Sequence, residues 1–424
     1  MPSSVATSAA RRGLGLVLAA EAISITGNRL AMIAIPWFVL ETTGDPARAG
    51  LTGVAYFLPV VLGGVLGGAL VDRFGFVRSS VAADVASGLT VAAIPLLHQV
   101  DQLSFGWMLV LTFVGSLLDV PGTTARRALL PGLATQAAVR LERVMSAHET
   151  VIRVAQLAGG LLGGALILAV GAVGVLVVDA ASFLVSALLV GLIARRALPV
   201  APTSAGRRRY LADIHEGLAF IRADALLPGL LVLFMVANMV DNALFAVLLP
   251  TVAEQVLDDP LALGLSIAAF GAGALVGAVS FGVFGHRLPR RAVLATALVV
   301  SGAPKFVVLA FVPSVPALVA VMVVAGVAAG PVNPLLTSAQ FSRVPPELRG
   351  RVSGAIMSAV VTAVPLGAFG AGLLVSHLGL TPTLVLAAAL YLLISAYPAV
   401  GPAWRHLDAP PARPASAPPP GAGA

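Results

Sequence analysis

The sequence contains no cysteine, and only 11% of its 424 residues are charged. The absence of cysteine excludes disulfides, thiolate metal sites and cysteine nucleophiles. Hydrophobic residues make up 58% of the chain, which leaves too little polar surface to cover a soluble globule of this size. The composition therefore indicates a membrane protein.

Enzyme motifs are missing as well. The chain has neither a phosphate-binding Gly-Lys-Ser/Thr loop nor a Gly-x-Ser-x-Gly elbow, and its six histidines lie in or near predicted loops without metal-ligand spacing. The formal charge of +7 comes from arginines at the ends of apolar segments rather than from one basic face, which argues against nucleic acid as a partner. We therefore expect neither an enzyme nor a bound metal or cofactor.

Apolar segments of membrane-spanning length recur along the whole chain. They lie at about 13–40, 47–72, 77–98, 105–125, 146–170, 171–194, 226–250, 261–285, 291–313, 315–340, 350–375 and 380–402. The first segment follows two arginines but is too long for a cleaved signal peptide. The sequence thus predicts an all-α membrane protein with twelve spanning helices.

Arginine predicts the orientation of these helices. Most arginines gather in alternate turns between the segments, whereas the opposite turns hold Arg48 alone together with several acids. Because positively charged turns stay in the cytoplasm, this bias places both chain ends there.

The chain divides into two halves of six predicted helices. We expect a tail at 1–12, bundles at 13–196 and 226–402, a linker at 197–225 and a disordered, Pro- and Ala-rich tail at 403–424. The linker ends in an amphipathic stretch that predicts a helix lying in the membrane interface, with a plain solvated linker as the alternative. Small residues four apart recur in helices two, five, eight and eleven, as repeats of three helices would produce.

A short charged turn joins the second and third predicted helices. It reads Asp72-Arg-Phe-Gly-Phe-Val-Arg78 and follows Gly68 closely. This stretch resembles the signature loop of the major facilitator superfamily, although Phe76 stands where a basic residue is common. A plain helical hairpin with charges reaching to the interface is the alternative.

Further segments resemble one branch of that superfamily. Residues 25–44, 179–183, 213–222 and 344–352 resemble the bacterial exporter group that includes enterobactin exporters and macrolide efflux proteins. Asn28 departs from an acid that is usual in the group. The resemblance implies a transporter that exports a small amphipathic drug, antibiotic or siderophore-like compound by alternating access.

The resemblance also implies that a proton gradient drives the export. We expect a monomer in the lipid bilayer that handles a small-molecule substrate. An uptake carrier and a transport-inactive sensor or scaffold of the same fold are the alternatives.

Polar residues inside spanning helices cost roughly 2.5 to 3.5 kcal/mol each, so they face a wet cavity or a partner. The candidates for the substrate and proton pathway are Glu21, Asn28, Arg29, Arg153, Asp179, Asn238, Asp241, Asn242, Lys305 and Asn333. Residues of helices one and seven lie at matching depth and predict two walls of a central cavity; bonding among these side chains alone is the alternative. We expect Arg153 to pair with Glu21, whereas Lys305 has no evident partner in the sequence.

The charged turn predicts a gate at the cytoplasmic side. Its candidate residues are Gly68, Asp72, Arg73, Gly75, Arg78, Asp84 and Asp119. When that side is shut, we expect Asp72 to meet the N-terminus of helix eleven, while Arg73 or Arg78 reaches the carboxylates of Asp84 and Asp119.

Overall fold

The computed structural model of the chain describes residues 4–193, 207–285, 288–401 and 404; within these, only the backbone is described at 4–7, 61, 64–70, 72, 207–213 and 399–400. All regular structure in these residues is helical. The first half holds α1 (Ser4–Thr43), α2 (Pro46–Phe74), α3 (Phe76–Gln99), α4 (Phe105–Gln136) and α5 (Leu141–Gly191). The predicted tail beyond residue 404 lies outside the described residues.

The second half contains more and shorter helices because several of its spans are interrupted. A linker helix α6 (Arg207–Ala223) precedes α7 (Leu227–Ala243), the π-helical turn η1 (Leu244–Leu248), α8 (Leu249–Gln255), α9 (Pro260–Phe284), α10 (Arg290–Ser301), α11 (Ala303–Phe311), α12 (Val315–Ala329), α13 (Val332–Arg343), the 3-10 turn η3 (Pro346–Leu348), α14 (Arg349–Leu378) and α15 (Leu380–Val400).

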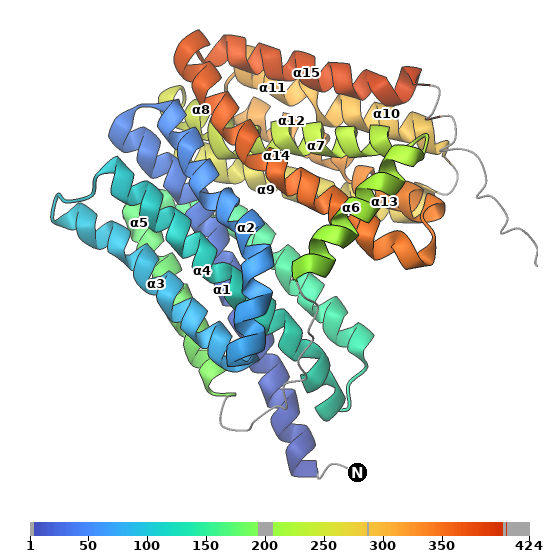
Figure 1. Cartoon of the computed structure of the whole chain (residues 1–424). Coiled ribbons are helices and arrows are strands. Elements are labelled where there is room, and N and C mark those ends of the chain that lie inside the picture. Colours follow the sequence, from blue (N-terminus) through green and yellow to red (C-terminus); the bar gives the residue numbers. More distant parts are fainter. Residues whose placement is uncertain (1–3, 194–206, 286–287, 402–403, 405–424) are drawn as a thin grey trace, which may run out of the picture.

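Ten stretches of the described residues are long and apolar enough to cross a membrane. One of them, α5, turns at Gly171, whose φ of 72° favours glycine, and so forms two antiparallel arms. Helix α2, with 29 residues, is long enough for one more span. These elements account for the twelve predicted spans, which Figure 1 shows as two bundles, α1 to α5 and α7 to α15.

The two halves begin equivalent helices with the same local chemistry. Asp45 caps α2 by accepting a hydrogen bond from the backbone N–H of Ala47 at 2.9 Å, and Asp259 caps α9 in the same way from Leu261 at 2.8 Å. Proline follows each aspartate at the first helical position, where its missing N–H costs nothing. The two Asp-Pro starts mark corresponding points of the two repeats.

Three spans of the second half are broken in the middle of the bundle. The π-helical turn interrupts the seventh span between α7 and α8. Gly302 separates α10 from α11 in the ninth span, and Gly330-Pro331 separates α12 from α13 in the tenth. Proline in or just after each of these breaks removes a helical hydrogen bond and so favours the interruption.

The halves meet near the turn between α1 and α2, which we call the first-loop end. The side chain of Gln255 donates to the backbone oxygen of Gly44 at 3.2 Å, and Ser376 donates to Asp45 at 3.0 Å. A Cβ at Gly50 would lie 2.5 Å from the backbone oxygen of Ala368, so α2 and α14 are in backbone contact there. Figure 1 shows the two bundles diverging from this end toward the end where α1 begins.

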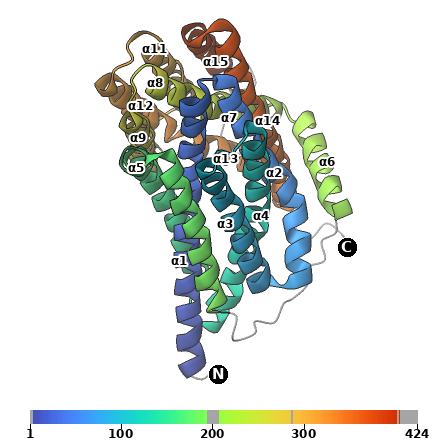
Figure 2. The ribbon, with the colours of Figure 1, turned by 90° about the vertical axis from the view of Figure 1, so that its left-hand side faces the viewer.

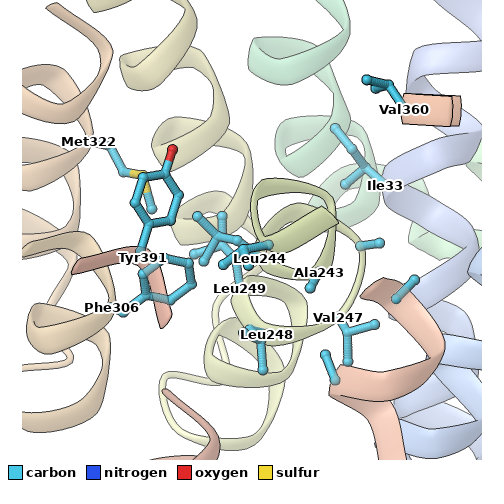
Figure 3. Packing of buried hydrophobic residues seen from close by; sticks show 14 of the residues in the cluster. Ile33, Ala243, Leu244, Val247, Leu248, Leu249, Phe306, Met322, Val360 and Tyr391 are labelled. Atoms are coloured by element: carbon cyan, nitrogen blue, oxygen red, sulfur yellow. The ribbon is translucent and has the colours of Figure 1, made fainter. Parts of the chain in front are cut away.

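Apolar packing extends from one half to the other at their junction. The main buried cluster includes Ile33 of α1 and the π-helical residues Leu244 and Leu248. Figure 3 shows part of this cluster, with Ile33 and Val247 on neighbouring helices. The seventh span therefore packs against both bundles.

The linker helix α6 packs along the second half. Glu216 forms an ion pair with Arg351 of α14 at 2.5 Å, and a Cβ at Gly217 would lie 2.5 Å from the backbone oxygen of Arg351. Figure 2 shows α6 beside α14 at the edge of the molecule.

Candidate functional site

Arg126 is the centre of a buried charge network in the first half. The sequence places it in a turn, because the predicted fourth span ends at residue 125. That assignment is wrong: α4 continues to Gln136, and the Arg126 side chain is fully buried. The apolar pattern misled the prediction because a charged residue at the edge of an apolar segment usually reaches water.

Three carboxylates from three helices surround this guanidinium. Glu21 of α1 contacts Arg126 Nε, Asp84 of α3 lies 2.5 Å from Nη1, and Asp119 of α4 lies 3.9 Å from Nη2. Buried charges of this kind are tolerated when they are paired and hydrogen-bonded. The sequence named all three acids as candidates but not the arginine that joins them.

Neutral polar groups complete the network. Ser186, on the second arm of α5, donates a hydrogen bond to Asp84 at 2.7 Å, and Arg126 donates to Ser24 at 3.3 Å. Asn28 donates to Asp119 at 3.0 Å. These contacts tie α1, α3, α4 and α5 together at one level of the bundle.

His148 is a member of this network that sequence reasoning missed. It lies inside α5, is only 2% exposed, and places Nε2 3.5 Å from Glu21 Oε1. Its Nδ1 has no hydrogen-bond partner within the described residues. Val144, His148 and Ala155 are all buried and share one helix face, and this spacing is the signal in the sequence that could have placed the histidine inward.

The carboxylates predicted to act in the gate therefore have other partners. Asp84 and Asp119 bind Arg126 and Asn28, whereas Arg73 and Arg78 are exposed, and Arg73 lies 5.5 Å from the Phe74 ring.

The turn itself has the geometry that its glycine allows. Gly75 joins α2 to α3 with a φ of 80°. Gly68 and the side chain of Asp72 lie outside the part of the chain whose side chains are described, so the contact of Asp72 with helix eleven stays a prediction.

The predicted bridge between Glu21 and Arg153 is not present. Glu21 is held by Arg126 and His148, and the Arg153 side chain is exposed. Arg29 donates to the Met32 sulfur at 3.5 Å and is half-buried. Arg126 takes the place of Arg153 because α4 packs against α1 deep in the bundle.

Asp179 is buried on the second arm of α5, with 1% of its surface exposed. Ser182 lies 3.5 Å away, and a Cβ at Gly27 would lie 2.5 Å from the Asp179 carboxylate. This acid therefore faces α1, on the same side of the bundle as the Arg126 network.

A second, smaller polar cluster lies in the other half. Lys305 of α11 is fully buried and pairs with Asp241 of α7 at 2.5 Å. The Tyr391 hydroxyl of α15 donates to the second Asp241 oxygen at 3.2 Å. The structure thus supplies a partner for Lys305 that the sequence did not reveal, because the two residues come from separate spans.

The remaining candidates do not join either cluster. Asn238 is exposed and donates back to the Phe234 carbonyl of its own helix at 2.8 Å. Asn333 is exposed just after the break in the tenth span. The Asn242 side-chain oxygen is buried and has no hydrogen-bond partner within the described residues.

Comparison with known families places this geometry in context. The family model for transmembrane secretion effectors matches residues 10–418. The multidrug efflux pump Tap of Mycolicibacterium fortuitum is 31% identical over 405 residues, covering 95% of this chain and 98% of the pump. Macrolide efflux protein A of Streptococcus pyogenes is 22% identical over 390 residues, covering 89% and 93%.

Solved structures share the fold at low sequence identity. A mutant of the nucleoside transporter NupG aligns with a TM-score of 0.76 at 13% identity, over 91% of this chain and 99% of that one. A bacterial homologue of the human lysosomal transporter Spinster, inward-facing and unoccupied, aligns with a TM-score of 0.71 at 15% identity, over 95% and 99%. These matches confirm the predicted two-bundle fold.

Proposed function

Because the chain belongs to the transmembrane secretion effector family of the major facilitator superfamily, we propose that it exports small amphipathic drugs or antibiotics across the cytoplasmic membrane. Members of this superfamily are transporters rather than enzymes. The observation that carries the proposal is the similarity, over nearly the whole length of both chains, to a multidrug efflux pump and to a macrolide efflux protein.

We place the first-loop end outside the cell. Its turns carry acids such as Asp101 and Asp258 with Arg48, whereas the turns at the other end are rich in arginine. The contacts between the halves at Gly44, Asp45 and Gly50 then close the extracellular side. A molecule closed on that side is the state expected to load an exported compound from the cytoplasm.

Proton coupling is the proposed role of the Arg126 network. Three carboxyl groups share one guanidinium in a region of low dielectric constant, so charge balance favours a proton on one of them. Glu21 is the acid nearest to His148, and Asp119 lies at the far side of the network, next to Asn28. A proton that moves between these acids changes which of them holds Arg126, and so changes the packing of α1 against α4.

The first experiment measures transport in proteoliposomes with erythromycin as the probe and an imposed pH gradient. Glu21→Gln and Asp119→Asn should lose gradient-driven accumulation and keep downhill exchange. Glu149→Gln is the matched control, because this exposed acid follows His148 directly without joining the network. Full uphill transport in both network variants would exclude these acids from coupling.

Direction and orientation need separate tests. Cells that produce the protein should accumulate less erythromycin than cells without it, and greater accumulation would show uptake instead. Since the chain has no cysteine, Asp258→Cys offers a single labelling site in the turn between α8 and α9. An impermeant thiol reagent should label it from outside the cell, and labelling only from the inside would reverse the proposed orientation.

A further inference from the structure

Lys305 is the only lysine in the sequence, and it lies where a spanning helix breaks. The ninth span is interrupted at Gly302, three residues before it. Its side chain is 0% exposed. A buried ammonium at this depth is costly, so the surroundings that stabilise it indicate what the site recognises.

Those surroundings are three aromatic faces and one carboxylate. The Lys305 ammonium lies 5.4 Å from the ring centroids of Phe270 and Phe306 and 5.0 Å from that of Tyr391. Asp241 lies 2.5 Å away on the remaining side. Rings at such distances attract cations through their negative faces, and a carboxylate supplies the matching charge. We call these four residues the ammonium cage.

The backbone shapes the cage. A Cβ at Gly302 would meet the Tyr391 ring in a severe clash, so the ring lies directly against the backbone where the helix breaks. Figure 3 shows the Phe306 and Tyr391 rings side by side, and their centroids are 6.2 Å apart. Asp241 lies shortly before the π-helical turn. Two irregular spans, as well as α9 and α15, therefore converge on the lysine.

One wall of the cage is open. The Asp241 side chain is 31% exposed, while the lysine that it holds is fully buried. A compound that reaches Asp241 therefore meets a carboxylate whose charge Lys305 has already neutralised.

We propose that Lys305 is a specificity-determining residue: it fills, as a tethered cation, a cage built for an organic ammonium group, and so excludes cationic groups of substrates from the second half. This inference rests on the proposed export function and names the charge class that one half of the site accepts. The part of a substrate that meets Asp241 is therefore uncharged or hydrogen-bonding. A cationic group gains no electrostatic attraction there, because the Lys305–Asp241 pair is already neutral.

The test empties the cage. Lys305→Ala removes three carbons and one nitrogen, the heavy atoms of propylammonium, and leaves Asp241 without its cation. Propylammonium should bind this variant at least tenfold more tightly than the parent, and it should raise the thermal unfolding temperature of the variant, whereas uncharged propan-1-ol should not. The measurement uses the full-length protein in detergent, purified with propylammonium present if the empty cage unfolds.

Matched variants separate the cage from simple cavity filling. Lys305→Ala with Asp241→Asn keeps the emptied space and removes the carboxylate, so the gain in propylammonium binding should disappear. Lys305→Arg keeps the positive charge and should show no gain. Equal rescue by propan-1-ol, equal binding by the double variant, or no rescue by propylammonium would each overturn the proposal.

The assay is independent of the proposed export function. Propylammonium binding is measured without transport. A failure of erythromycin export by the parent protein would therefore contradict the proposed export function without contradicting the proposal for the ammonium cage. If Lys305→Ala does not bind propylammonium while the parent protein exports erythromycin, only the proposal for the ammonium cage is contradicted.

Discussion

The two halves of this molecule share their helix order but differ in how they bury charge. The first half gathers Glu21, Asp84 and Asp119 around one arginine, with more acids than bases. The second half pairs one buried base, Lys305, with a partly exposed acid, Asp241, and aromatic rings surround the ammonium group. Equivalent scaffolds therefore carry one network with an excess of carboxyl groups and one neutral pair.

Under the proposed proton-coupled export, this difference assigns coupling to one half and ligand choice to the other. A network with more carboxyl groups than cations can hold an extra proton and pass it among its members. A balanced pair has no such excess, and its partly exposed carboxylate, already neutralised by Lys305, can influence which substrate groups bind beside it. We therefore expect variants of the first half to affect coupling and variants of the second to affect ligand choice.

The largest expected effect comes from removing the centre of the network. Arg126→Leu leaves three buried carboxyl groups without their cation, which should cost about 3 to 5 kcal/mol of folding stability, as for other broken buried ion pairs. Arg127→Leu is the matched control, because the neighbouring arginine is exposed. Thermal unfolding in detergent checks both, and equal unfolding temperatures would show that Arg126 does not hold the first half together.

A second comparison replaces one carboxylate in each half by the corresponding amide. Asp84→Asn should lower gradient-driven export about tenfold, roughly 1.4 kcal/mol, because it removes one of the groups that share the proton. Asp241→Asn should leave the ratio of protons to substrate unchanged and alter substrate affinity instead. Proton flux and drug flux are measured together in proteoliposomes. A changed ratio of protons to substrate in Asp241→Asn would contradict the assignment of coupling to the first half and ligand choice to the second.

The sequence predicted the fold well because its signals are local. Apolar length and small residues four apart act within a few residues, so spans and bundles follow from them. The Gly330-Pro331 pair at the break in the tenth span is a local signal of the same kind. The π-helical turn has no such signal, because no residue type marks it.

The site was predicted only in part, because its partners are distant in the chain. Single polar residues in apolar runs identify Glu21, Asp241 and Lys305, but their pairing depends on which helix faces lie together. Arg126 and His148 were missed because each lies at the edge of an apolar run, where a charged side chain normally reaches water. Helices that extend beyond the apolar run bury both.

The contact between the halves offers a third test. A Cβ at Gly372 would lie 2.6 Å from the backbone oxygen of Pro46, whereas Gly370 has open space around it. Gly372→Val should therefore weaken the closed first-loop end by about 1 to 3 kcal/mol, while Gly370→Val should not. Distances between spin labels at Asp101→Cys and Asp258→Cys measure the opening, and unchanged distances in Gly372→Val would show that this contact does not hold the halves together.

The smallest expected effect concerns the turn between α6 and α7, outside both buried clusters. Asp224 accepts hydrogen bonds from the backbone N–H groups of Leu226 and Leu227 at 2.7 and 3.0 Å and from Arg343 at 2.9 Å. Burial opposes ionisation of this carboxyl group, but these bonds outweigh it and lower the pKa of Asp224. Asp224→Asn should therefore destabilise the protein at pH 7, by about 1 kcal/mol.

The lowered pKa of Asp224 determines how the destabilisation by Asp224→Asn depends on pH. Because the folded pKa of Asp224 lies below its unfolded value, the ionised group adds stability above about pH 4, and that stability is lost as the pH falls through the folded pKa. The gap in unfolding temperature between the parent and Asp224→Asn should therefore narrow below about pH 4. Glu347→Gln, which alters an exposed acid, should show no such gap. A gap that stays constant with pH would mean that Asp224 acts through its shape rather than its charge.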